Sequence, residues 1–576
     1  MKKNLLALLL AMCMLAMVFS GCGSQAASAV QDAASAVQEA VEDAADTAAD
    51  AAQDTATDAA EAVTDAASAL ESAVEEAGPE IEYPEITYPL VDEPTTLTYW
   101  QAWPPFLNEI SAPEDAAMYD ALEEATGVHL SITAVSTENE STDFMLMCAG
   151  GDLLDMIQKG YTHYSEAGAG DAIEDDMMID LLPWLEEYSA NYYRMMMEDQ
   201  TFYNAVVDDQ GRVPSLIGMY KDPYYTDQGM WIRQDILDQV GKDVPKTIDE
   251  LDEVLAAFKD KGLTDPLVVL SEGNSDMLSR AYDCGDKLVD GKIVNNSLGD
   301  EGKQMMLKMH EYYEKGYINV DFVTYTDSNT KPPQDVVLSD NAGMFVEDVA
   351  SIAGYKNMSN NPDFDLEPMG QVRLTADQVL NTGFIGQYAA DKYSLSISTN
   401  CEDVPLAIQY MDYLFSDEGF VMANYGIEGY TYTVAADGSY EFTDLILANE
   451  KGFDWQLCQS LYINPGFPCL NDLAAQELTY NDAQKAAVPT WVAAYDGTDE
   501  TVPNQSWLSY LPEESSRQSE LQSDLDTYQE EMRLKFITGQ LDIDAEWDNY
   551  VATCKSMGFE ELQEITQAAV DRYLAK

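Results

Sequence analysis

Positive charge is scarce in this sequence. The chain has 104 Asp and Glu residues but only 29 Lys and Arg residues, and its formal net charge is −75. The deficit extends beyond the first 80 residues, because residues 81–576 contain 90 acidic and 27 basic residues, a net of −63. A surface of this sign repels phosphate backbones and anionic headgroups, which excludes nucleic acid and a bare anionic membrane as partners. The ordinary explanation for such an acidic composition is that it keeps the protein soluble.

Histidine is nearly absent, and so are the motifs of the common catalytic sites. The three histidines are His129, His163 and His310, and none lies in an HExxH motif. The sequence has no GxSxG nucleophile elbow and no GxxxxGK[ST] phosphate loop. We therefore predict no catalytic residue. A glycoside hydrolase stays open as an alternative, since that chemistry needs only two carboxylates in a cleft.

Cysteine is too sparse and too scattered for a zinc site. None of the eight cysteines forms a CxxC pair. Cys458 and Cys469 are close enough in sequence to form a disulfide. Buried free thiols fit the sequence equally well, so the pairing is left open.

Long apolar runs are confined to the amino terminus. Lys2 and Lys3 precede the apolar run 5–19, which is too short to span a membrane comfortably, so residues 1–22 are predicted to be a signal peptide. The sequence FSGC, ending at Cys22, resembles a lipobox, although Phe19 stands where Leu is usual. That resemblance implies a lipoprotein cleaved before Cys22 and acylated there, for example with palmitate. We expect the body on the extracellular face of a bacterial cell membrane.

A region of low complexity follows the predicted lipid anchor. Residues 23–80 consist mainly of Ala, Asp, Glu, Ser, Thr, Gln and Val, with no Lys or Arg. Such a composition cannot bury a core, so residues 23–94 are predicted to be a stalk or linker, extended or intermittently helical. The spacing of Val30, Val37 and Val41 leaves a coiled coil as the alternative.

The stretch from Met230 to Gly262 has the clearest local signals of the body. Its first residues, MWIR, predict a buried strand end. Gly241 is expected to close a short helix in the left-handed conformation. Thr247 and Glu250 have capping-box spacing, so a second helix is predicted to begin there and to stop at Gly262. One apolar stripe follows this helix at three- and four-residue spacing: Ile248, Leu251, Val254, Leu255 and Phe258.

Strands and helices alternate around this stretch. Near the start of the body, LTYWQAW, VHLSITAV and Met156-Ile157 predict strands, with helices between them over 112–126 and 143–149. This order favours a parallel α/β lobe. Further helices are expected over 302–316 and from Pro405 to Ser416, with a break at Gly419. The carboxyl end, 513–576, predicts three helices separated at Gly539 and Gly558.

The Met230–Gly262 unit resembles that of extracellular solute-binding protein family 1, the large oligosaccharide-type substrate-binding lipoproteins of ABC importers. The family pattern Trp-Ile-Arg-x-Asp-x-Leu, then Pro-x-Thr-x-Asp-Glu-Leu, is matched by Trp231, Ile232, Arg233, Asp235, Leu237, Pro245, Thr247, Asp249, Glu250 and Leu251. Further segments along the chain are also similar to the family, and they occur in the same order as in its members. They include residues 150–157, 179–188, 341–345, 397–433 and 536–550. Leu154 departs from the pattern, where relatives have proline. The likeness spans residues 95–576.

The resemblance implies a type II, periplasmic-binding-protein-like α/β fold, with two discontinuous lobes around a ligand cleft and a helical carboxyl terminus. The expected parts are lobe 1 over 95–218 and 392–450, lobe 2 over 219–391, and a helical part over 451–576 that belongs mainly to lobe 2. It also implies a monomer that captures a carbohydrate, an oligosaccharide above all, and delivers it to ABC permease subunits without acting as an enzyme. The alternatives are a binding protein for peptide or another polar solute, a cell-surface glycoside hydrolase, and a structural adhesin.

No metal or cofactor is carried over from the resemblance. Relatives often place a calcium-binding loop of the Asp-x-Asn-x-Asn-Gly kind after the helix that ends here at Gly262. The corresponding residues, Lys261 to Pro266, lack the series of oxygen ligands that calcium needs.

Sugar binding needs aromatic faces for pyranose rings and planar polar groups for hydroxyls, arranged in a concave site. Of twelve candidates we select seven as ligand-binding: Trp103, Tyr161, Tyr225, Trp231, Arg233, Tyr388 and Trp455. The other five are Trp100, Tyr224, Tyr462, Trp491 and Trp507. For each aromatic residue a packing role is the alternative. Arg233 has an ion pair with Asp235 as its alternative.

Overall fold

A computed structural model describes residues 81, 83–103, 115–159, 164, 170–221, 228–270, 276–324, 332–380, 394–453, 455–493 and 508–576. The chain divides into two compact units, Met1–Tyr83 and Pro84–Lys576. The predictions for the signal peptide, Cys22 and the stalk up to residue 80 lie outside the described residues.

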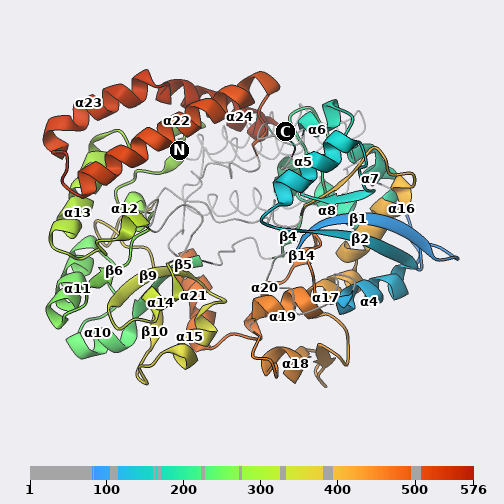
Figure 1. Cartoon of the computed structure of the whole chain (residues 1–576), viewed down its shortest axis with the longest axis horizontal. Coiled ribbons are helices and arrows are strands. Elements are labelled where there is room, and N and C mark those ends of the chain that lie inside the picture. The colour runs from blue at the N-terminus through green and yellow to red at the C-terminus, as the bar shows by residue number, and fades with distance from the viewer. Residues whose placement is uncertain are drawn as a thin grey trace, which may run out of the picture. The chain divides into compact units, whose positions relative to one another are not determined.

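The first sheet has the parallel core that the alternation predicts (Figure 1). Its order is β11-β3-β1-β2, built from β1 Thr95–Trp103, β2 Val128–Ser136, β3 Met156–Gln158 and β11 Leu395–Ile397. Strands β2 and β3 both run parallel to β1, and β11 closes the other edge antiparallel to β3. Two non-adjacent stretches of chain therefore share this sheet.

The helices around the first sheet begin and end near the expected positions. Helix α4 (Ala117–Thr126) stops at Gly127, which has a φ of 78°. Helix α5 (Glu140–Gly150) leads into β3, and Phe144 and Cys148 of this helix pack with Trp100. The other helices of this part of the chain are α6 Gly170–Glu174, α7 Leu182–Tyr188, α8 Asn191–Glu198, α9 Gln200–Val206, α16 Val404–Asp412, α17 Asp417–Tyr425, α18 Asp444–Leu447, α19 Trp455–Tyr462 and α20 Leu473–Glu477.

The expected break at Gly419 is wrong, because this glycine lies inside α17 and is buried there. A Cβ at Gly419 would lie 1.8 Å from the carbonyl oxygen of Tyr413, which belongs to the preceding 3-10 turn η4 (Tyr413–Phe415). The glycine is thus needed for close packing of two consecutive helical segments, and it does not end a helix. The helix predicted from Pro405 instead gives way to η4, and α17 starts at Asp417.

The second sheet is mixed, with order β10-β5-β9-β6. Its strands are β5 Gln228–Arg233, β6 Asp265–Leu267, β9 Ala342–Asp348 and β10 Leu366–Met369. Strand β6 runs parallel to β9, whereas β5 runs antiparallel to both β9 and β10. The carboxyl ends of β6, β9 and β10 therefore lie at the same edge as the amino end of β5.

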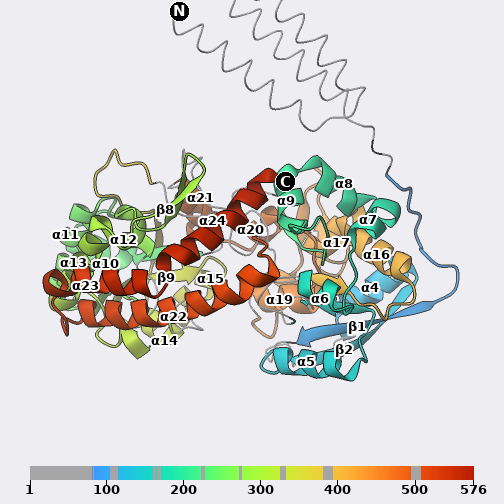
Figure 2. The ribbon, with the colours of Figure 1, turned by 90° about the horizontal axis from the view of Figure 1, so that it is seen from above.

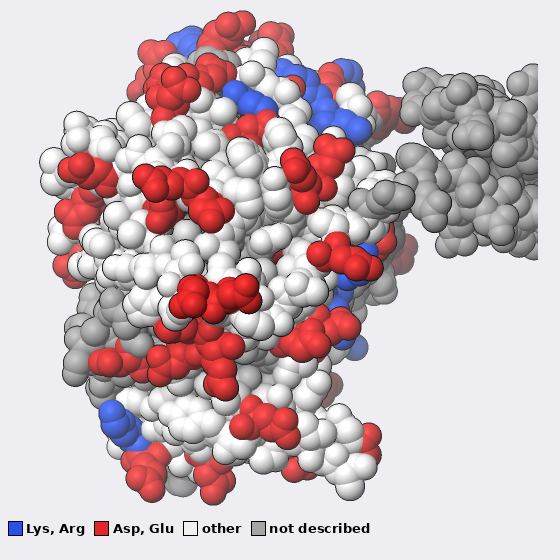
Figure 3. Space-filling view, turned by 90° about the vertical axis from the view of Figure 1, so that its right-hand side faces the viewer, with Lys and Arg blue, Asp and Glu red and all other residues white. Residues whose placement is uncertain are grey.

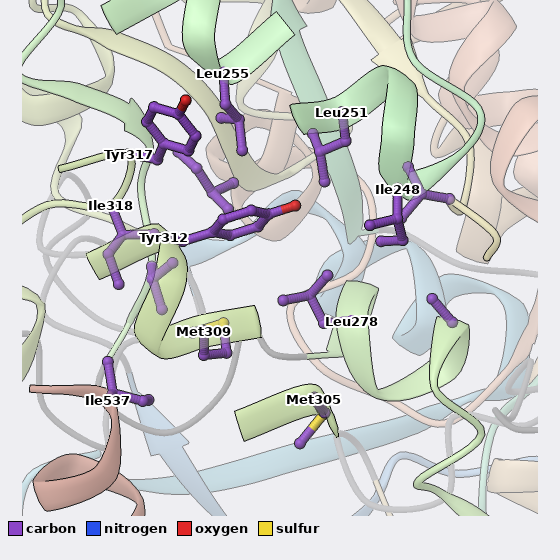
Figure 4. Close-up of a cluster of buried hydrophobic side chains, with 14 of the residues drawn as sticks. Ile248, Leu251, Leu255, Leu278, Met305, Met309, Tyr312, Tyr317, Ile318 and Ile537 are labelled. Atoms are coloured by element: carbon purple, nitrogen blue, oxygen red, sulfur yellow. The ribbon is translucent and has the colours of Figure 1, made fainter. Parts of the chain in front are cut away.

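The strand–helix unit that opens the second sheet folds as its local signals predict. Helix α10 (Gln234–Val240) ends at Gly241 with a φ of 66°, and α11 (Ile248–Lys261) begins with a capping box between Thr247 and Glu250. All five residues of the predicted stripe are buried. Figure 4 shows three of them, Ile248, Leu251 and Leu255, in one cluster with side chains of α12 (Asp276–Ala281) and α13 (Asp300–Glu314).

The three predicted carboxyl-terminal helices are confirmed as α22 Pro512–Ile537, α23 Ile543–Ser556 and α24 Phe559–Ala575. Gly539 and Gly558 separate them, both with positive φ. Residues of α22 and α23 belong to the same buried cluster as α11 and α13. The end of α24 instead contacts the turn after α9, where Arg572 pairs with Asp209 and the Lys576 ammonium donates to the Val207 carbonyl oxygen over 2.5 Å. Figure 2 shows α24 ending beside α9.

The remaining elements are short. Strand β4 (Met219–Tyr220) pairs with β14 (Leu470–Asn471), β7 (Asp286–Val289) with β8 (Lys292–Asn295), and β12 (Tyr432–Val434) with β13 (Tyr440–Phe442). The other helical segments are η3 Phe322–Thr324, α14 Gln334–Val337, α15 Ile352–Met358 and α21 Asp482–Val492.

Candidate functional site

The carboxyl ends of β1, β2 and β3 lie at one edge of the first sheet, at Trp103, Ser136 and Gln158. The chain leaves β1 to form β2 on one side and then crosses to form β3 on the other. In α/β sheets a ligand site is expected at such a change of direction, just beyond the carboxyl ends. Trp103 is the last residue of β1 and pairs in register with Ser136. Its backbone therefore lies at the edge where a ligand is expected.

Two buried amides organise this edge. The Gln101 amide nitrogen donates to the Pro465 carbonyl oxygen over 3.0 Å, and the Gln158 amide nitrogen donates to the Gly466 carbonyl oxygen over 2.8 Å. The side-chain carbonyl oxygen of Gln158 in turn accepts a hydrogen bond of 3.2 Å from the backbone N–H of Ala102. The segment after α19 is thus fixed across the ends of β1 and β3. Sequence reasoning missed this role, although a polar Gln101 between the apolar Trp100 and Ala102 was a usable signal.

The first basic residue at this edge is Lys159, directly after β3. Its ammonium lies 3.4 Å from a carboxylate oxygen of Glu140, whose side chain is 11% exposed. Glu140 is the first residue of α5, where a carboxylate is favoured by the unpaired backbone N–H groups of a helix start. The pair adds polarity to the edge with little net charge.

The equivalent edge of the second sheet has Gln228 and Asp348. These residues are paired in register at the start of β5 and the end of β9, and the Gln228 amide nitrogen donates to Asp348 Oδ1 over 3.1 Å. Beside them the indole ring of Trp491, from α21, lies on Gly229, where a Cβ would be 2.2 Å from the ring. Sequence reasoning did not select Gln228 or Asp348, because neither belongs to a recognisable motif.

Trp231 lies in the middle of β5 and is completely buried. Its indole N–H donates to the Glu347 carbonyl oxygen over 3.1 Å, and its ring meets that of Trp491 edge-on at 5.5 Å. A ligand role for Trp231 would require the carboxyl end of β5 to lie at the edge where a ligand is expected. Strand β5 runs in the opposite direction to β6, β9 and β10, so its carboxyl end lies at the edge opposite to their carboxyl ends. The structure therefore favours the packing role for Trp231.

Arg233, at the carboxyl end of β5, forms the ion pair with Asp235 that was the alternative to a ligand-binding role. Its guanidinium donates to both carboxylate oxygens of Asp235 at 2.8 and 2.9 Å and lies 4.3 Å from the ring centre of Phe364. A further hydrogen bond of 3.1 Å reaches the Ser339 carbonyl oxygen. The side chain is 1% exposed, so it has almost no surface to offer a ligand in this structure.

The other predicted ligand-binding residues are less fully described. Trp455 begins α19 and is half-buried, with its ring 5.3 Å from that of Phe442. Tyr161, Tyr225 and Tyr388 lie outside the described residues, as does the side chain of Trp103.

All six described cysteines are free and buried, which decides against a disulfide between Cys458 and Cys469. Burial raises the pKa of the Cys469 thiol to about 12.

No group of three or more His, Cys, Asp or Glu residues in the described ranges is arranged to hold a metal ion. Within the same ranges, no helix has the length and apolarity to cross a membrane.

The sequence matches the model of a known family over residues 108–419, and that family is described as bacterial extracellular solute-binding protein. The chain belongs to this family. Its relatives include the polygalacturonan/rhamnogalacturonan-binding protein YtcQ of Bacillus subtilis (strain 168), 23% identical over 491 residues that cover 81% of this chain and 90% of YtcQ. They also include the fructooligosaccharide ABC transporter substrate-binding protein FusA of Streptococcus pneumoniae serotype 4 (strain ATCC BAA-334 / TIGR4). FusA is 23% identical over 551 residues that cover 87% of this chain and 94% of that protein.

Solved structures of this family establish the fold. The HMO-binding, ABC-transporter-associated solute-binding protein of Bifidobacterium longum infantis ATCC 15697 has a TM-score of 0.67 at 18% identity, covering 84% of this chain and 99% of that one. S. pneumoniae FusA in complex with kestose has a TM-score of 0.65 at 18% identity, covering 83% and 99%. The predicted two-lobed α/β fold with a helical carboxyl terminus is confirmed. The expected lobe boundaries stay predictions.

Proposed function

We propose that this protein captures an oligosaccharide between its two lobes and delivers it to the permease subunits of an ABC transporter. The observation that carries the proposal is the match to YtcQ and FusA over more than four-fifths of this chain, since both are named for the carbohydrates they bind. The two polar sheet edges described above are the places where an α/β fold presents such a ligand. A closed state would be favoured on binding because only that state contacts the ligand from both lobes.

Within this proposal, Trp103, Tyr161, Tyr225, Tyr388 and Trp455 remain the aromatic candidates for stacking on sugar rings. Lys159, Gln228 and Asp348 join them as polar candidates because they lie at the two edges. The protein acts as a binder and not as an enzyme, in line with relatives that are named as binding proteins.

We further propose that the protein is a monomer held at the extracellular face of the membrane by a lipid on Cys22. Membership of an extracellular family and a relative named Lipoprotein LipO, 22% identical over 349 residues, support a surface location. The FSGC sequence is the basis for the anchor itself.

A thermal-shift screen over a glycan library, followed by calorimetry and mass spectrometry of the recovered ligand, tests the proposed function. An oligosaccharide at 100 times its dissociation constant should stabilise the fold by about 2.7 kcal/mol and be recovered unchanged. Recovery of a shortened glycan would instead identify a glycoside hydrolase. Stabilisation by peptides and by no glycan would overturn the carbohydrate assignment.

A further inference from the structure

Tyr430, between α17 and β12, has the most exposed aromatic side chain among the residues that the structure describes, with an exposed fraction of 44%. Most charged groups on the face of the molecule in Figure 3 are carboxylates, and an exposed phenol ring offers a contact of a different, apolar kind. A single exposed ring carries no functional meaning by itself, so its support and its neighbours decide what it can do.

The turn that carries Tyr430 is rigidly built. The backbone N–H of Tyr430 donates to the Ile427 carbonyl oxygen over 3.1 Å, and its carbonyl oxygen accepts a hydrogen bond of 2.8 Å from Thr443 Oγ1. The buried hydroxyl of the next residue, Thr431, donates to the Tyr425 carbonyl oxygen over 2.7 Å and accepts the Ile427 backbone N–H over 2.7 Å. The exposed ring is thus presented by a fixed backbone, which lowers the entropy cost of binding a ligand there.

A second tyrosine stands beside the first. The ring of Tyr430 meets that of Tyr462 edge-on, with 6.3 Å between the ring centres and 86° between the ring planes. Tyr462 is the last residue of α19 and is half-buried. Two rings at a right angle form a corner that offers a flat apolar face, and each ring carries a hydroxyl that can donate and accept a hydrogen bond. An apolar face with polar groups beside it is the combination that a sugar ring needs.

The corner formed by these two rings is joined to the carboxyl ends of β1 and β3. The carbonyl oxygens that accept hydrogen bonds from the two buried amides of that edge belong to Pro465 and Gly466, three and four residues after Tyr462. Asn464 stiffens the connection, because its side-chain oxygen accepts the backbone N–H of Gly466 over 3.0 Å. Three residues of chain span at most about 11 Å, so an oligosaccharide bound at the edge can reach the corner.

We infer that Tyr430 and Tyr462 form an aromatic subsite that stacks on one sugar ring of an oligosaccharide held at the carboxyl ends of β1 and β3. This inference rests on the proposed function and adds a stacking position to it. A sugar is favoured over a protein as the occupant because α19 joins the corner to the edge where an α/β fold presents its ligand. Sequence reasoning named Tyr462 without selecting it and did not name Tyr430, because no periodicity or spacing marks an exposed tyrosine in a turn.

The experiment is calorimetry on the mature full-length chain. The probes are kestose, maltotriose, xylotriose and lacto-N-tetraose, and each probe that binds the wild-type protein is measured again with the variants. Tyr430→Ala should weaken binding by at least about 10-fold, the loss expected on removing an aromatic contact that matters. Its melting temperature should stay close to that of the wild type, because the side chain is exposed. Tyr430→Phe and Tyr430→Trp keep a flat ring and should bind within about 3-fold of the wild type.

A variant of the second ring tests whether the two tyrosines act together. Tyr462→Leu keeps much of the apolar volume and removes the ring, and it should weaken binding by about 3- to 10-fold. Combined with Tyr430→Ala, it should weaken binding by less than the product of the two separate losses, because both rings contact the same sugar ring. Melting curves establish that each variant is folded.

The matched control is Tyr188→Ala. Tyr188 ends α7, and its ring centre lies 6.0 Å from that of Trp184. Helix α7 follows the bridge between Met178 and Ser398, which lies just beyond the carboxyl end of β11 and so at the opposite edge of the first sheet. This variant should leave the affinity for every probe unchanged.

The outcomes separate the inference from the proposed function. An unchanged affinity in Tyr430→Ala overturns the inference and leaves oligosaccharide capture intact. If the uptake of the glycan by cells that carry the transporter nevertheless falls in that variant, the exposed ring contacts the permease instead. An equal loss of affinity in Tyr430→Ala and Tyr430→Phe overturns stacking as the cause. Failure of all four probes, and of the wider glycan library, to bind the wild-type protein overturns the proposed function and the inference together.

Discussion

Replacing Trp231 by alanine separates a packing role from a ligand-binding role. The side chain is completely buried among Val268, Phe345 and Trp491, and its N–H is satisfied by a backbone carbonyl. Truncation of a buried tryptophan costs about 3–5 kcal/mol of folding free energy, because it loses apolar burial and leaves a cavity. The lost hydrogen bond and edge-on aromatic contact place the expected value near the upper end, about 5 kcal/mol.

Urea unfolding and calorimetry on the same Trp231→Ala protein provide the test. We expect a large loss of stability, and an affinity for the identified glycan within about 3-fold of wild type when measured well below the melting temperature. Trp231→Phe is the matched control, since it keeps most of the apolar volume and loses the N–H, and it should lose clearly less stability than alanine. A stability loss under about 1 kcal/mol with an affinity loss of about 2 kcal/mol or more would refute the reasoning and return Trp231 to the binding site.

Four further outcomes are expected. Mass spectrometry of the mature protein should find a lipid-modified Cys22 as the amino terminus, and an intact chain starting at Met1 would contradict this. Addition of EGTA should leave melting temperature and affinity unchanged, whereas a fall of several degrees would reveal a calcium site. Deleting residues 23–80 should preserve full-length affinity, because their composition cannot form a core, and lost binding or solubility would show that they pack on the body. Gly419→Ala should destabilise the fold by about 1–3 kcal/mol through overpacking, while Gly354→Ala, in a helix with only the flexible end of Met358 nearby, should be neutral or stabilising by up to about 1 kcal/mol. Equal effects of the two glycine substitutions in urea unfolding would refute the packing argument.

The sequence by itself determined the local structure of this protein. Thr247, Glu250, Gly241 and Gly262 set the ends of two helices through interactions within a few residues, which is why their spacing was sufficient. The stripe from Ile248 to Phe258 identified the buried face because helical periodicity is a local property. The ordered series of family-like segments then indicated the two-lobed fold that the solved structures confirm.

Only the tertiary structure decided which residues reach the candidate site. The direction of β5 depends on pairing with β9 and β10, more than 100 residues away in sequence, and that direction places Trp231 in the core and Gln228 at the edge. Gln101 likewise contacts Pro465 across a separation of 364 residues, which no local pattern encodes. Strand order and direction are set by the sum of many distant contacts, so a motif can identify a strand without showing which of its ends faces the ligand.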